Sequence, residues 1–267
     1  MQKAFSKPWE ELFNDTNYRI CWEKTIGKNT ACNFILATKI AELGVSKGTR
    51  LNENGEVEVT DILYDSPTNK EWFPFYSPHV DVENLFNNEL GKFIKLYSFA
   101  EKLKRMAIEV LGLKEEWVFG TDKQKNTLTD IKWEDMPGPA LKKGRMTARE
   151  VLQVVGTDFF RSIYKNVWVD SCLRQITEDS SELALISDVR FENEILAIQN
   201  AGGFVVGLKR NPSKKKDKHP SETAIEKCIN LCDVVINNQP LTIPQQNEQI
   251  YLTIKHLDNI PDISLEE

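Results

Sequence analysis

The clearest pattern of apolar and polar positions runs through residues 183–208. Leu183–Ser187 is a short apolar run of the kind that forms a buried strand, and it ends abruptly in charged residues. The pattern that follows, FENEILAIQNAGG, predicts a helix with acidic residues in its first turn and Gly202-Gly203 as the stop signal. Phe204–Leu208 is a second apolar run. The segment therefore predicts a strand–helix–strand unit.

A similar alternation begins near the N-terminus. Tyr18–Trp22 reads as the first core strand, and Thr30–Gly44 reads as a helix that ends at its glycine. Within that helix Leu36, Ile40 and Leu43 are spaced i, i+4 and i+7, which predicts one apolar face.

The rhythm resumes further along the chain. Phe93–Tyr97 predicts a strand and Glu101–Leu111 an amphipathic helix, and a loop-rich stretch over Gly120–Gly144 follows. Thr147 starts another helix, because Glu150 three residues later completes a capping box. Strands that alternate with helices in this way predict the α/β fold class.

Residues 45–92 interrupt the alternation, and we expect them to form an insertion. Asn52–Gly55 is a turn signal between two alternating segments, which predicts a β-hairpin. The aromatic run Trp72–Pro78 follows it. Connections in compact α/β units are usually only about 2–6 residues long, so this segment exceeds an ordinary loop.

Composition sets limits on the class of protein. With 267 residues, 40% hydrophobic and 28% charged, the chain can bury one large α/β core. A net charge of −6 argues against a dedicated nucleic-acid coat, and we expect no stable nucleic-acid complex. The five cysteines form no CxxC pair, and no targeting peptide or membrane-length apolar run is visible. We therefore expect reduced thiols, no membrane association and a cytoplasmic protein.

Charged residues follow both strands of the strand–helix–strand unit. Asp188 and Arg190 come after the first strand, and Lys209 and Arg210 end the second. Open α/β sheets bind ligands at the carboxyl ends of their strands. Two arginines and a lysine at such a place indicate a ligand that carries phosphate.

A short motif between the first strand and the first helix has the chemistry of a phosphate-binding loop. Gly27-Lys28-Asn29-Thr30 provides backbone N–H groups at a helix N-terminus, a lysine for the β- and γ-phosphates and a hydroxyl for Mg²⁺. The G-K-x-T spacing is the one found in nucleoside monophosphate kinases.

Four segments together resemble the bacteriophage deoxynucleoside monophosphate kinases, a branch of the P-loop kinases. They are Gly27–Thr30, Ser98–Lys104, Arg149–Trp168 and the block that runs from Ser187–Glu194 through His219–Glu222 to Asp233–Asn238. The resemblance implies a single domain over residues 1–267 with a doubly wound, mostly parallel sheet. It also implies ATP and Mg²⁺, a deoxynucleotide acceptor, a lid over residues 210–222 and a homodimer.

The resemblance assigns a role to each matched position. The acceptor nucleotide would be bound by Ser98, Phe99, Lys104, Gln153, Gly156, Thr157 and Arg161. Of these, Gln153, Gly156 and Thr157 would contact the base, and Arg161 would grip the phosphate. Phe99 is equally explained as a core residue, and Gly156 as the residue at a buried helix crossing.

The remaining roles concern the donor and the transfer step. Asp188 would orient Mg²⁺ together with Thr30, Arg190 would neutralise phosphate charge, and Arg210 would belong to the lid. Asn237 and Asn238 would border the adenine pocket. An ion pair between Asp188 and Arg190 is the structural alternative.

Three functions remain open. The first is ATP-dependent phosphorylation of a deoxynucleoside monophosphate to the diphosphate. The second is a kinase-like protein that acts through nucleotide binding or protein contacts, because Trp22 and Thr25 replace glycines that let the backbone approach phosphate. The third is a kinase for a modified nucleotide in DNA, which the acidic balance disfavours.

Overall fold

The computed structural model describes residues 20–22, 28–62, 72–76, 85, 90–136, 142–209, 228–239 and 241–258. The chain divides into two compact units. Unit 1 comprises Met1–Tyr97 and Ile176–Glu267, and unit 2 comprises Ser98–Gln175. The single-domain organisation stays a prediction. The N-terminal arm, the lid segment 210–222 and His219 lie outside the described residues.

Unit 1 is built on a five-stranded parallel sheet with the order β10-β9-β1-β8-β5. Its strands are β1 (Ile20–Trp22), β5 (Ile94–Tyr97), β8 (Leu183–Ile186), β9 (Phe204–Lys209) and β10 (Val234–Asn237). All four residues of β8 are buried, as expected for an apolar run in the interior of a parallel sheet. The α/β class is confirmed, and so are the predicted strands that correspond to β1, β5, β8 and β9.

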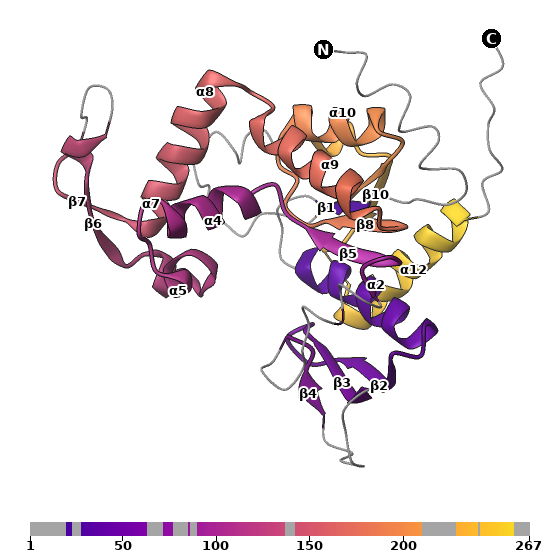
Figure 1. Cartoon of the computed structure of the whole chain (residues 1–267). Helices are drawn as coiled ribbons and strands as arrows, with labels where there is room; N and C mark the ends of the chain where they lie inside the picture. Colours follow the sequence, from indigo (N-terminus) through magenta and orange to yellow (C-terminus); the bar gives the residue numbers. More distant parts are fainter. Residues whose placement is uncertain are drawn as a thin grey trace, which may run out of the picture. The chain divides into compact units, whose positions relative to one another are not determined.

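Helices cover this sheet on both faces. In Figure 1, α10 (Glu192–Asn200) lies on one face, and α2 (Lys28–Glu42) and α12 (Ile243–Asp258) lie on the other. Leu36 and Ile40 of α2 are fully buried, as their spacing predicts. The prediction for Leu43 is wrong, because α2 ends at Glu42 and the Leu43 side chain is 37% exposed.

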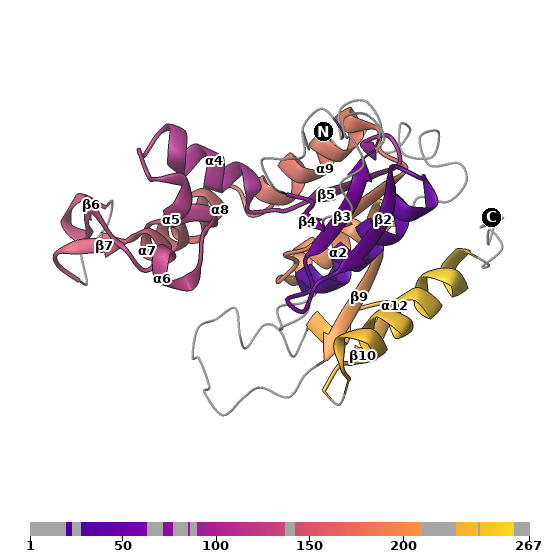
Figure 2. The ribbon, with the colours of Figure 1, turned by 90° about the horizontal axis from the view of Figure 1, so that it is seen from below.

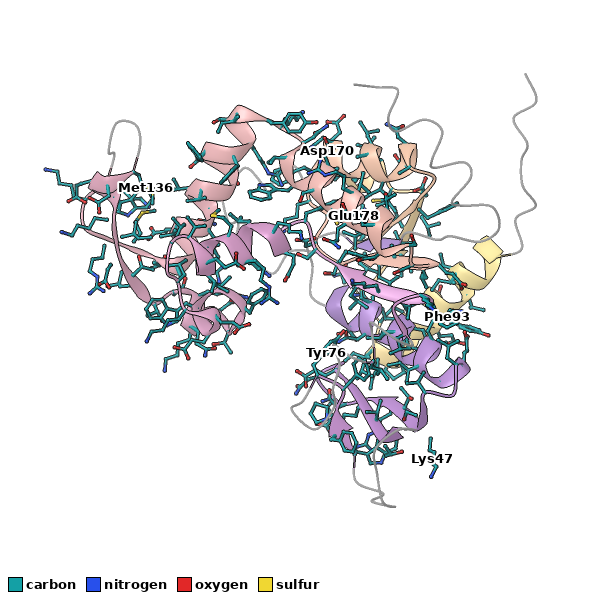
Figure 3. All side chains as sticks on the ribbon, in the orientation of Figure 1. Lys47, Tyr76, Phe93, Met136, Asp170 and Glu178 are labelled. Carbon is teal, nitrogen blue, oxygen red and sulfur yellow. The ribbon has the colours of Figure 1, made fainter. Side chains whose placement is uncertain are left out.

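The predicted hairpin forms a small antiparallel sheet against α2. Its strands are β2 (Ser46–Leu51), β3 (Val57–Ile62) and β4 (Phe73–Pro74), and Figure 2 shows them beside the helix. Val57, Val59 and Phe75 are buried in the same hydrophobic core as α2. The exposed Tyr76, labelled in Figure 3, lies with its ring edge-on to Phe75 at 5.1 Å. This part of residues 45–92 therefore packs into unit 1.

Unit 2 is mainly helical, with one two-stranded sheet. Its elements are α4 (Glu101–Glu109), α5 (Glu115–Phe119), α6 (Asp122–Lys125), β6 (Leu128–Lys132), η3 (Trp133–Asp135), β7 (Arg145–Thr147), α7 (Ala148–Gln153), η4 (Val154–Phe160) and α8 (Arg161–Ile163). Helix α9 (Val167–Asp179) begins in unit 2 and ends in unit 1. The prediction that Gly120–Gly144 is loop-rich is wrong, since β6 pairs with β7 in an antiparallel hairpin.

Two local features fix the helical run from α7 to α8. The predicted capping box is confirmed: the Thr147 hydroxyl accepts from the Glu150 backbone N–H at 3.2 Å, and the Glu150 carboxylate accepts from the Thr147 backbone N–H at 3.0 Å. Next, η4 is a seven-residue π-helical segment, a geometry that occurs frequently at functional sites.

None of the helices in the described part of the chain is long and apolar enough to cross a membrane.

Candidate functional site

The carboxyl edge of the unit 1 sheet brings three predicted groups together. The chain leaves β1 toward α2 and β5, and it leaves the neighbouring β8 in the other direction, toward α10 and β9. Connections that diverge from adjacent strands open a crevice at their carboxyl ends, where α/β sheets bind ligands. The start of α2, the loop after β8 and the residue that ends β10 all lie at this edge.

The start of α2 carries the predicted phosphate-binding residues. Lys28 is the first residue of the helix, while Gly27 and the side chains of Lys28 and Asn29 lie outside the described residues. Thr30 is only 9% exposed. It lies beneath the β2–β3 turn, where a Cβ built on Gly55 would come within 2.4 Å of its Oγ1. The inserted hairpin thus covers the residue predicted to reach Mg²⁺.

A hydrogen bond to the same turn fixes this arrangement. The Asn33 side-chain amide donates to the Gly55 carbonyl at 2.9 Å. Gly55 adopts φ +76°, which glycine tolerates and other residues rarely do. The contact joins segments more than twenty residues apart, so it could not be predicted from the spacing within the G-K-x-T motif.

The loop after β8 is held by a buried carboxylate. Glu194, 1% exposed, accepts hydrogen bonds from the backbone N–H groups of Arg190 at 2.6 Å and Phe191 at 3.0 Å. These bonds satisfy donors at the start of α10 and set the backbone between Asp188 and the helix. The sequence marks Glu194 only as an acidic residue in the first helical turn. Its role as the anchor of this loop depends on the reversal of the chain after β8.

The side chains of this loop differ in their surroundings. Asp188 is half-buried and has a polar or ionic partner, whereas the half-buried Arg190 guanidinium makes no hydrogen bond or ion pair within the described part of the chain. No contact between Arg190 and Asp188 therefore supports the structural alternative, in which the two residues form an ion pair. An arginine at this edge that has no partner among the described residues can bind an anion.

The other predicted positions of unit 1 are only partly described. Asn237 ends β10 and is exposed, and its side-chain oxygen accepts from the Gln239 backbone N–H at 3.4 Å. The adjacent Asn238 is 3% exposed, and its backbone N–H donates to the Lys209 carbonyl at 2.8 Å. Arg210 lies outside the described residues. Asn237 is the more accessible of the two asparagines.

All seven predicted acceptor residues belong to unit 2. Gln153, Thr157 and Arg161 recur every fourth residue along the helical run from α7 to α8 and so share one face. Gln153 and Thr157 are exposed and Arg161 is half-buried. A face of this composition offers hydrogen-bonding groups and one positive charge to a ligand.

Gly156 and Phe99 have structural surroundings. A Cβ on Gly156 would lie 2.4 Å from Leu103 Cδ2, so the absence of a side chain at this position leaves room for Leu103 of α4. The Gly156 carbonyl accepts from Trp168 Nε1 at 2.9 Å, and Phe99 is 3% exposed. Gly156 and Phe99 therefore contribute to the interior packing of unit 2, independently of any ligand on its exposed face.

The other two acceptor positions lie at the start of unit 2. The Ser98 hydroxyl accepts from the Ala100 backbone N–H at 3.2 Å, just before α4. Lys104 lies on α4, with its Nζ 4.8 Å from the centre of the Phe119 ring. The aromatic face accommodates the ammonium group. Lys104 remains half-buried rather than enclosed.

Two comparisons with known proteins bear on this site. The family described as "Deoxynucleotide monophosphate kinase" matches residues 83–245, more than half of the chain. The chain is also 30% identical over 159 residues to a protein of Acanthamoeba polyphaga mimivirus named "Putative deoxynucleotide monophosphate kinase". That similarity covers 54% of this chain and 75% of the relative. The family match includes all of unit 2 and the loop after β8 but begins beyond α2 and the hairpin. The chain belongs to the deoxynucleotide monophosphate kinase family.

Proposed function

We propose that the chain transfers the γ-phosphoryl group of ATP to a deoxynucleoside monophosphate and releases the diphosphate, in a doubly wound fold closed by a lid over residues 210–222. The observation that carries the proposal is the Arg190 guanidinium, which has no partner within the described part of the chain and lies at the carboxyl edge of the sheet. Family membership indicates the class of reaction. In this proposal Arg190 makes the contact with the transferred phosphate.

Phosphoryl transfer depends on positioning and charge more than on covalent chemistry. Arg190 presents a planar guanidinium that can donate to two phosphate oxygens at once, and Glu194 fixes the backbone that carries it. Lys28, as the first residue of α2, lies where backbone N–H groups and the helix dipole favour phosphate. In this proposal both residues hold the transferred group.

Of the two predicted ligands for Mg²⁺, Asp188 suits the ion directly. Asp188 offers a half-buried carboxylate at the strand end, and hard oxygen ligands of this kind suit Mg²⁺. Thr30 offers a hydroxyl, but the β2–β3 turn covers it. Asp188 is therefore the principal protein ligand in our proposal and Thr30 the secondary one. When bound with ATP, the ion would neutralise charge on the phosphates.

The charge of unit 2 supports its role as the acceptor-binding part. Its sequence has 14 lysines and arginines against 11 aspartates and glutamates, a net charge of +3, whereas the rest of the chain carries −9. A positive potential raises the local concentration of an anionic nucleotide. In this proposal Arg161 binds the acceptor phosphate, and Gln153 and Thr157 meet the base.

The test is a transfer assay with a panel of acceptors. Wild-type protein is incubated with ATP, Mg²⁺ and each of the four deoxynucleoside monophosphates, and with the corresponding ribonucleotides as controls. We expect formation of at least one deoxynucleoside diphosphate, faster than that of any ribonucleoside diphosphate. Transfer to ribonucleotides alone, or to no acceptor, would contradict the proposal.

A second function is favoured by the covered Thr30. With that hydroxyl beneath Gly55 and with Trp22 and Thr25 in place of glycines, the chain would bind nucleotide without transferring phosphate. An ATP titration with and without Mg²⁺ separates the two functions. The kinase requires tighter ATP binding with Mg²⁺ together with turnover, whereas the binding protein shows nucleotide affinity and no turnover.

A further inference from the structure

Two buried side chains hold the main chain of Arg190 at both of its polar groups. Glu194 accepts a hydrogen bond from its backbone N–H at 2.6 Å, and the Cys228 thiol donates to its carbonyl at 3.7 Å. Glu194 is 1% exposed and Cys228 is 2% exposed, so both contacts are shielded from water. A thiol is a weak donor with a large sulfur atom, which accounts for the longer distance. The backbone of Arg190 is therefore fixed, and the freedom that remains is that of its side chain.

The segment before β10, residues 228–233, is tied to two neighbouring elements of unit 1. Gln199 of α10 donates from Nε2 to the Leu231 carbonyl at 2.9 Å and to Asp233 Oδ1 at 3.0 Å. The other carboxylate oxygen of Asp233 accepts from the Val205 backbone N–H of β9 at 2.7 Å. These bonds hold the 228–233 segment against both α10 and β9.

Packing against β9 fixes the same segment further. Gly207 of β9 has no side chain, and a Cβ built there would lie 2.8 Å from Ile229 Cδ1 and 3.0 Å from Cys232 Sγ. These two side chains therefore occupy the space that a side chain on the strand would fill. The Cys232 thiol also donates to the Cys228 carbonyl at 3.4 Å. Cys228 thus belongs to a segment that is anchored through hydrogen bonds and through packing.

Such support matters for a group that must meet a transferred phosphate. The half-buried Arg190 guanidinium has no hydrogen bond or ion pair within the described part of the chain, so its reach depends on where its main chain is held. A misplacement of about 1 Å in a reacting group can cost about 100-fold in rate. Glu194 and Cys228 are closed off from solvent, so any influence that they have on the reaction passes through Arg190.

We propose that Glu194 and Cys228 are positioning residues of the transfer step, which act by fixing the main chain of Arg190. The inference rests on the proposed function, in which Arg190 contacts the transferred phosphate. It extends the site to the 228–233 segment, which provides none of the site residues predicted from the sequence.

A double-mutant cycle with Arg190 tests the proposal. Glu194→Met removes the acceptor oxygen and keeps an unbranched side chain, and we expect it to lower kcat by about 100-fold with little change in the KM for ATP. In an Arg190→Ala background the same substitution should lower kcat by about twofold or less, because the guanidinium that Glu194 positions is gone. Glu194→Gln keeps one acceptor oxygen and should retain most of the turnover. Single-turnover transfer of labelled phosphate, expressed per folded molecule, resolves the low rates of the Arg190→Ala proteins.

The chain offers matched controls for both substitutions. Cys228→Ala should lower kcat by about threefold to tenfold, less than Glu194→Met because a thiol is a weak donor, and this loss should also vanish in the Arg190→Ala background. Cys172→Ala changes another buried cysteine, 6% exposed and on α9, and should keep its turnover. Glu150→Met removes a carboxylate that caps α7 as Glu194 caps α10. Any loss from Glu150→Met should be the same in both backgrounds.

The outcomes separate this inference from the proposed function. Equal losses from Glu194→Met in both backgrounds, or normal turnover per folded molecule, would overturn the inference while the kinase activity stands. If Glu194→Met does not fold, the cycle with Cys228→Ala gives the answer by the same criteria. If the wild-type protein transfers no phosphate, the proposed function falls and dissociation constants for ATP complete the cycle. A loss of ATP affinity that depends on Arg190 would then keep the positioning role, and an unchanged affinity would remove it.

Discussion

Replacement of Gly55 by alanine tests the contact between the inserted hairpin and α2. The new Cβ would lie 2.4 Å from Thr30 Oγ1 and 2.5 Å from its Cγ2, closer than real contacts allow. Alanine at φ +76° costs about 1–2 kcal/mol. Displacement of a packed neighbour costs about 1–3 kcal/mol more. We therefore expect Gly55→Ala to lower the free energy of unfolding by about 2–5 kcal/mol.

Gly44→Ala is the matched control. Gly44 also has a positive φ, +64°, but a Cβ there would meet nothing within 4 Å. It should therefore cost only the backbone term of about 1–2 kcal/mol. Urea denaturation followed by tryptophan fluorescence gives both values. Equal losses in the two variants would refute the argument that the turn presses on Thr30.

Three further predictions address the site and unit 2. Lys28→Ala should abolish phosphoryl transfer and leave the melting temperature nearly unchanged, as measured by turnover and thermal melting. Burial raises the pKa of Glu150, but hydrogen bonds from Thr147 and the pairing with Lys142 outweigh it and hold the pKa below the ordinary 4.5. This stabilisation is present above pH 4.5 and is lost as the pH falls through the lower folded value, so Glu150→Gln should flatten the acid side of a stability–pH curve. Gly156→Ala should destabilise the protein by about 1–3 kcal/mol, because the new Cβ meets Leu103. The substitution should also raise the KM for the acceptor more than the KM for ATP. Steady-state kinetics with each substrate varied measures both KM values.

The elements of the sheet could be predicted because their signals are local. β8 is an uninterrupted apolar run, and α10 follows it with acidic residues at its start and Gly202 at φ +73° after its end. The same logic failed for Leu43, because the positive φ of Gly44 ends α2 before the third apolar position faces the core. Periodicity identifies a helix more reliably than its last turn.

The β6–β7 hairpin escaped prediction because its pattern is weak. Only Thr129 of β6 is buried, and the strand also carries exposed charges at Asp130 and Lys132. Thr129 donates to the Met146 carbonyl at 2.9 Å, a contact across the hairpin that no local pattern reveals. Strand assignment from sequence depends on alternation, and a polar inward residue removes that signal.

The candidate site was predictable in its residue types but not in its contacts. Charges at the ends of β8 and β9 indicated a phosphate ligand, since strand ends converge on one edge. The burial of Thr30 under Gly55 and the anchoring of Arg190 by Glu194 depend on how the chain folds back. Such contacts are set by packing rather than by spacing along the sequence.

The central claim is that Arg190 binds the transferred phosphate, and Arg190→Lys tests it most directly. The control is Arg50→Lys, because Arg50 is a structural arginine, ion-paired to Glu58 at 2.8 Å and stacked 4.2 Å from the Trp72 ring centre. Turnover per folded molecule is measured alongside the melting temperature. We predict that Arg190→Lys loses most transfer at an unchanged melting temperature, whereas Arg50→Lys keeps its turnover. A destabilised Arg190→Lys with normal turnover would contradict the account.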